Sequence, residues 1–212
     1  MTALLRYQGA LLLRSQRWLA PLVVYAAFVA VGIRPGDPVL DSLGFAAAGL
    51  VPLTAWLVRV CVTNEPDAAR DCTAAARGPV RVHAAALLTG LGAALITGGA
   101  AGGAVLLLGR RTGAGAAEAA LAGAGGLLVC ALAGAAVGAL CSRPLLTAPG
   151  YAVPAAGLGS LLALVIAGSP ARVAVTGLVT GSARLPVGAL AGALALACAA
   201  GAAACLVSAR RG

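Results

Sequence analysis

The chain has no lysine, one histidine and few aromatic or charged residues. Only 3% of its 212 residues are aromatic and 10% are charged, whereas about 25% are charged in an ordinary soluble domain. A P-loop ATPase motif needs a lysine, so this chain cannot hydrolyse ATP through that motif. The single His83 leaves too few ligands for a histidine metal site. The scarcity of aromatic residues argues against nucleic acid as a partner.

Other catalytic patterns are missing as well. The sequence contains no GxSxG nucleophile elbow, no HExxH pair and no close pair of carboxylates within an apolar segment. Asp41 and Glu118 fall at the ends of apolar segments, whereas a proton relay needs ionisable groups inside the membrane. We therefore expect that this chain is not an enzyme and binds no cofactor of its own.

Apolar residues make up 61% of the chain, and its mean hydropathy is +0.99. Six segments approach or exceed the roughly 20 residues that a helix needs to cross a bilayer. We predict an all-α integral membrane protein, with one transmembrane domain over residues 1–212. Its expected spans lie at about 18–33, 42–60, 82–108, 119–142, 145–169 and 185–208. The first is short, so Arg17 and Arg34 would have to snorkel at its two ends.

The arginines indicate the orientation of these spans. With a cytoplasmic N-terminus, ten arginines fall on the inner side and five on the outer side, which favours cytoplasmic positions for both termini. The inner set is Arg6, Arg14, Arg17, Arg59, Arg70, Arg77, Arg81, Arg143, Arg210 and Arg211, and the outer set is Arg34, Arg110, Arg111, Arg172 and Arg184. The net charge of +9 is then mainly a topology signal.

The N-terminal residues 1–17 predict a helix that lies in the inner membrane interface. Arg6, Arg14 and Arg17 fall along one side of a helical projection, with leucines elsewhere around it. A basic, amphipathic helix of this kind binds membrane lipid at the headgroup level. We expect the chain to turn into the membrane at Trp18.

Charged residues are concentrated between the second and third apolar segments, over residues 63–81. Asn64 is expected to cap a helix over about residues 65–77, and Gly78 followed by Pro79 should end it. The helix carries acids before bases and is close to neutral, whereas a helix that binds anionic lipid would be basic. Docking onto another protein suits this composition, and a solvated connector is the alternative.

Small residues dominate the apolar segments. The GxxxG spacing, which lets helices approach closely in lipid, occurs at Gly98 and Gly102, Gly99 and Gly103, Gly134 and Gly138, and Gly188 and Gly192. Because the chain has 30 glycines, such spacings also arise by chance. We expect tight helix packing and favour no single pair.

The segment 169–184 is too polar and too rich in glycine for one continuous spanning helix. A re-entrant or interfacial pair of short helices fits it, because broken helices are tolerated where protein buries them. A plain outer loop fits it equally well.

The whole arrangement resembles the ABC transporter type-2 permeases of high-GC bacteria, also called type V exporters. The sequence likeness is concentrated in RVCVTNEPDAARDCTAAARGPVRVHAA, residues 59–85. This stretch is similar to the family's acidic and basic loop, which is followed by a small residue, a proline and the third span. The commoner family pattern has two glutamates and then Gly-Thr, where this chain has Glu65 and Asp67 and then two alanines.

The resemblance implies a permease subunit of an ATP-driven exporter in a bacterial plasma membrane. The loop would form the coupling helix that docks on a separate ABC ATPase subunit, which would bind ATP and Mg. Carried over, the docking residues are Glu65, Asp67, Arg70, Asp71 and Arg77. The family also implies a second permease chain, either identical or a sister. The alternative is an accessory or scaffold multi-pass membrane protein without transport activity.

The orientation predicts which positions a membrane-impermeant thiol reagent can reach. Engineered cysteines at positions 37 and 113 should be labelled from outside intact cells, and those at 74 and 210 only after the cells are opened, because of the arginine distribution. Labelling of position 74 from outside alone would contradict this orientation.

Overall fold

The computed structural model describes residues 1–110, 115–143, 145 and 149–211, and Arg111 and the label position 113 lie outside this part. The described residues form helices and no β-strand. The helices are α1 (Thr2–Ser15), α2 (Leu19–Gly32), α3 (Val39–Thr63), α4 (Asp67–Arg77), α5 (Pro79–Leu108), α6 (Ala116–Leu140), α7 (Pro149–Val165), α8 (Pro170–Val179) and α9 (Val187–Arg211). The prediction of an all-α chain is confirmed.

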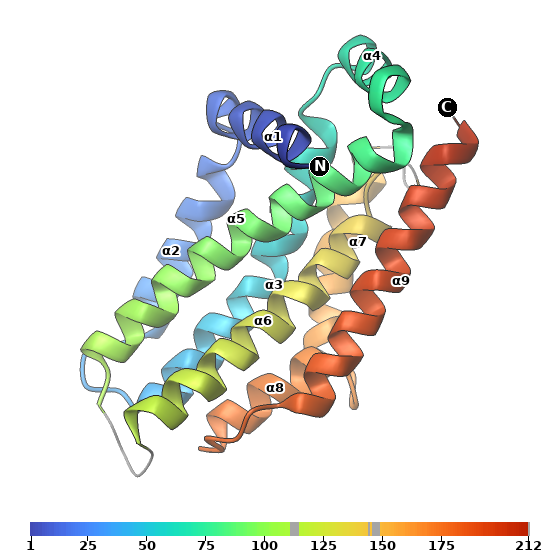
Figure 1. The fold of residues 1–212 in the computed structure, drawn as a ribbon. Helices are drawn as coiled ribbons and strands as arrows, with labels where there is room; N and C mark the ends of the chain where they lie inside the picture. Colours follow the sequence, from blue (N-terminus) through green and yellow to red (C-terminus); the bar gives the residue numbers. More distant parts are fainter. Residues whose placement is uncertain (111–114, 144, 146–148, 212) are drawn as a thin grey trace.

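The long helices run side by side as a bundle, and α1 lies across one end of it (Figure 1). Most residues of α3 and α6 are buried in the bundle, whereas only a minority of the residues of α5 and α9 are. The N-terminus, α4 and the C-terminal end of α9 lie at the same end as α1, which we call the α4 end (Figure 1). The short α8 lies at the opposite end.

Among the residues that the structure describes, four helices are long and apolar enough to cross a membrane: α3, α5, α6 and α9. Counting the bent pair of α7 and α8 as one span gives five, so the chain is a multi-pass membrane protein. The expected first span, residues 18–33, is a helix of only 14 residues. At 1.5 Å per residue it covers about 21 Å, less than the roughly 30 Å of a hydrocarbon core. The six predicted spans are therefore not all confirmed.

Helix α2 packs against α3 through aromatic side chains. The hydroxyl group of Tyr25 donates a hydrogen bond to the Ala46 carbonyl oxygen at 3.0 Å. The rings of Phe28 and Phe45 stack with their centroids 4.2 Å apart. These contacts hold α2 against α3, although α2 is short.

The chain bends by 54° between α7 and α8. Gly168 supplies the turn with a φ of +86°, a conformation that costs a glycine little. On α8, Ala171, Ala174 and Leu178 are buried, and the helix packs mainly against α3 and α6. Part of the segment 169–184 is thus a short packed helix.

The four glycine pairs differ in what they contact. A Cβ atom on Gly134 would collide with the Val51 carbonyl oxygen, and one on Gly138 would lie 2.9 Å from the Ala55 carbonyl oxygen. This pair brings α6 against the backbone of α3. Gly98 and Gly102 face leucine side chains, whereas Gly99, Gly103 and Gly188 have nothing within 4 Å of an added Cβ.

Replacing Gly134 by alanine should destabilise the bundle by about 1–3 kcal/mol, because the rigid backbone of α3 cannot yield to the added methyl group. The measurement is the thermal unfolding midpoint of the detergent-solubilised chain. Gly99→Ala is the matched control, because the same change at the same motif spacing there meets open space. Equal effects of the two variants would contradict the close approach at Gly134.

Candidate functional site

Helix α1 rests on the α4 end through one face. Leu4, Gln8 and Leu12, spaced by four residues, are its buried residues. Leu4 packs against Val82 on α5, and Leu12 packs against a cluster from α3 and α5. The opposite face is free to contact lipid or solvent.

The residues predicted for the interfacial helix lie on that free side or just after it. Arg6 and Arg14 are exposed on α1, and Arg17 is exposed in the turn that leads to α2. Trp18 is half-buried, and its indole Nε1 donates to the Leu13 carbonyl oxygen at 3.4 Å. The αL conformation of Gln16, with a φ of 53°, ends α1 and redirects the chain.

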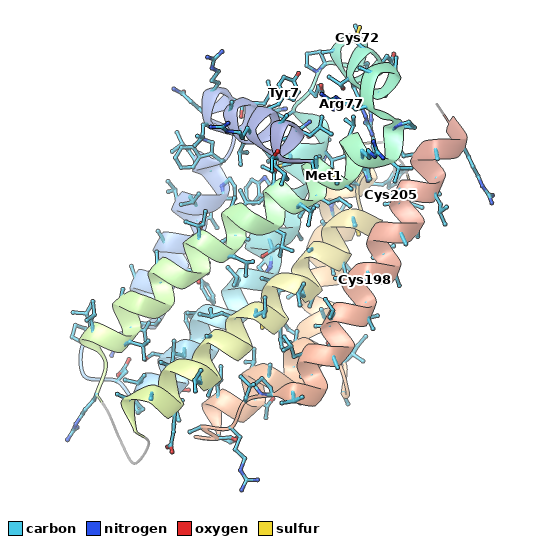
Figure 2. All side chains as sticks on the ribbon, viewed as in Figure 1. Met1, Tyr7, Cys72, Arg77, Cys198 and Cys205 are labelled. Atoms are coloured by element: carbon cyan, nitrogen blue, oxygen red, sulfur yellow. The ribbon has the colours of Figure 1, made fainter. Side chains whose placement is uncertain are left out.

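Glu65 is the buried polar centre of the α4 end and is only 7% exposed. Its Oε1 accepts hydrogen bonds from the Tyr7 hydroxyl at 3.0 Å and from the Thr73 hydroxyl at 3.2 Å. Its Oε2 accepts a hydrogen bond from Gln8 Nε2 at 3.1 Å. One carboxylate therefore ties α1 to α4, and Tyr7 is labelled on α1 in Figure 2.

The phenol of Tyr7 is suited to this donor role. Burial, together with the hydrogen bond and the negative charge of Glu65, raises the pKa of Tyr7 above its ordinary value. The hydroxyl group therefore keeps its proton well into the alkaline range and continues to donate to the carboxylate.

The predicted cap of α4 by Asn64 is wrong. Asn64 continues the helical conformation at the end of α3, and its Nδ2 donates to the Leu11 carbonyl oxygen of α1 at 3.0 Å. The N-cap position of α4 is Pro66, whose side chain has no hydrogen-bonding group. The predicted stop is correct, since α4 ends at Arg77, Gly78 has a φ of +87° and Pro79 begins α5.

Helix α4 contains no buried residue and projects from the bundle (Figure 1). Asp67, Asp71 and Arg77 are exposed, and Cys72 marks the outer tip of the helix in Figure 2. Arg70 is half-buried, with its Nη2 3.5 Å from Nδ1 of the buried His83 on α5.

One ion pair links α4 to the connection between α6 and α7. Asp67 Oδ1 lies 3.1 Å from Arg143 Nη1, and both side chains are substantially exposed. Such a surface pair contributes about 0–1 kcal/mol to stability. Its contribution is to orient α4, which packs otherwise mainly against α5.

The structure brings Glu65, Asp67 and Arg70 into contact with the rest of the chain and leaves Asp71 and Arg77 on the outer surface. Sequence reasoning missed Tyr7, Gln8, Thr73 and Arg143 as partners of the predicted residues. The i, i+4 spacing of Leu4, Gln8 and Leu12 was the signal that could have placed Gln8 on the buried face of α1. No such sequence pattern predicts the contact between Thr73 and Glu65 or the contact between Arg143 and Asp67.

These features define an all-helical, multi-pass membrane protein. Its α4 end is polar, and α1 lies across that end. Comparisons with family models, curated proteins and solved structures found no match to this chain. Assignment of a function therefore depends on the chain's own residues and on the resemblance described above.

Replacing Glu65 by alanine should loosen α1, because hydrogen bonds to a charged group contribute about 1.5–3 kcal/mol each. Amide hydrogen exchange over residues 2–15 should then become at least about tenfold faster. Asp71→Ala is the control, since it removes an acid that is exposed on α4. Unchanged exchange in Glu65→Ala would show that the carboxylate does not hold α1.

Proposed function

We propose that the chain is the permease subunit of an ATP-driven ABC exporter in a bacterial plasma membrane. In this proposal the six predicted segments all span the membrane, with α2 as a short first span and both termini in the cytoplasm. ATP and Mg bind to a separate ATPase subunit, and a second permease chain, identical or a sister, completes the translocation path.

The observation that carries the proposal is the exposure and attachment of α4. It has no buried residue, yet it follows α3 by three residues and precedes α5 by one. A partner that binds α4 can therefore push or pull on two membrane-spanning helices through short connections. This is the arrangement that a coupling helix requires.

The predicted docking residues divide into two roles. Asp71 and Arg77 are exposed and suit contacts with the ATPase, where charged groups fix the register of docking. Glu65, Asp67 and Arg70 contact other parts of this chain and suit the positioning of α4. Motion of a docked partner would then reach α1 through Glu65 and the α6–α7 connection through Asp67.

The bent pair of α7 and α8 supports a transport function as well. Broken helices at membrane depth are tolerated where protein surrounds them, and in many transporters they form the substrate and ion sites. An accessory or scaffold protein without transport activity remains the second candidate, because an exposed charged helix can also hold a non-ATPase partner. Recovery of an ATPase with the wild-type chain from its native membrane distinguishes the two.

Reversing the charges of Asp71 and Arg77 together should weaken ATPase binding while the bundle stays folded. Loss of one partner of a desolvated charge pair costs about 2–5 kcal/mol, whereas exposed substitutions change stability by about 0.5 kcal/mol. The measurement is recovery of the co-purifying ATPase with solubilised Asp71→Arg, Arg77→Glu chain, followed by ATP hydrolysis in reconstituted vesicles.

A matched control reverses Arg34 and Asp41, which are exposed at the opposite end and also leave the net charge unchanged. It should bind the ATPase as the wild type does. If the α4 reversal retains binding, hydrolysis and export, α4 is only a connector and the coupling proposal fails.

A further inference from the structure

A cavity of about 380 Å³ lies at the α4 end, beside the helix but separate from its exposed residues Asp71 and Arg77. Four arginines line it: Arg17 from the turn before α2, Arg59 from α3, Arg70 from α4 and Arg143 from the connection after α6. They come from four parts of the chain. Arginines that serve only as topology signals do not need to converge on one cavity.

The positive charge of this cavity is only partly neutralised. Glu65 and Asp67 are the acids in its lining, against four arginines. Asp67 pairs with Arg143, and both Glu65 oxygens accept hydrogen bonds from neutral side chains. The guanidinium groups of Arg17 and Arg59 have no hydrogen bond or ion pair with the residues that the structure describes.

A hydroxyl group adds a second, independent observation. Ser142 also lines the cavity and is 1% exposed. Its Oγ has no hydrogen-bond partner within the described ranges. A buried hydroxyl without a partner costs free energy, so this group favours a ligand oxygen that accepts its proton.

We propose that this cavity binds a phosphate group. Guanidinium groups match phosphate oxygens in paired, charge-assisted hydrogen bonds, and a serine hydroxyl adds a neutral donor. The cavity lies where α3 and α6 end, which is the depth of lipid headgroups. The phosphate comes either from an anionic phospholipid or from a soluble phosphorylated compound. This inference does not require the chain to be a transporter.

The test measures saturable binding of fluorescent phosphatidylglycerol to the full-length chain in detergent. Two comparison probes are phosphatidylcholine, whose headgroup neutralises the phosphate charge, and diacylglycerol, which has no phosphate. The paired variant Arg17→Gln, Arg59→Gln should weaken phosphatidylglycerol binding by about tenfold or more, because each arginine near a headgroup contributes to its attraction. Competition by inorganic phosphate would identify a soluble source, and its absence a lipid headgroup.

The matched control is Arg81→Gln with Arg210→Gln, which removes two exposed arginines at the same end that do not line the cavity. It should change binding by less than about twofold if the cavity is the site. Equal weakening by both pairs, or no saturable binding of phosphatidylglycerol or phosphate, would overturn the proposal. If the double variant is not monodisperse, Arg17→Gln alone repeats the test, since that side chain is exposed in a turn.

Discussion

The approach of α5 and α6 to the backbone of α3 is the constraint on which the rest of the bundle depends. In lipid there is no hydrophobic force between helices, so close packing of small residues must hold them together. Gly134 and Gly138 bring α6 against α3, and an added Cβ on Gly90 of α5 would lie 2.7 Å from the Val58 Cα. The abundance of glycine and alanine is thus a structural requirement at these positions.

This packing explains why the buried carboxylate Glu65 lies at an end of the bundle. A central helix that is surrounded by close neighbours leaves little room for side chains that could form a polar site at membrane depth. At the α4 end α3 stops at Thr63, and Glu65 follows two residues later. Three side-chain hydrogen bonds satisfy that buried carboxylate, which would otherwise be costly to bury.

The sequence predicted the helical class, the long spans and the boundary between α4 and α5, because hydropathy, length and the Gly78-Pro79 pair act locally. It could not separate Gly134 and Gly138 from Gly99 and Gly103, since the same spacing either faces α3 or open space depending on the rotation of the helix. The Asn64 cap failed for a similar reason. The Asn64 side chain donates to the Leu11 carbonyl oxygen on α1, although local capping rules assigned it to α4.

The same limit applies to the charged end. Sequence reasoning found five charged residues on one helix and assigned them a single role, whereas the structure divides them by exposure. Arg70 contacts His83 on α5 and also lines the arginine cavity, and Asp67 both pairs with Arg143 and lines that cavity. Arg143 lies 76 residues from Asp67, and His83 lies on the helix that follows Arg70, so no pattern within one helix encodes these partners.

This sharing has a consequence if both proposals hold. A phosphate group held in the cavity would compete with Asp67 for the guanidinium group of Arg143 and would change the equilibrium position of α4. Thermodynamic linkage between two binding sites is reciprocal. If the bound anion changes the affinity of α4 for its partner by some factor, the bound partner changes the affinity of the cavity for the anion by the same factor. Phosphate binding and docking of the partner would then both depend on the position of α4, and the Asp67–Arg143 pair would couple them.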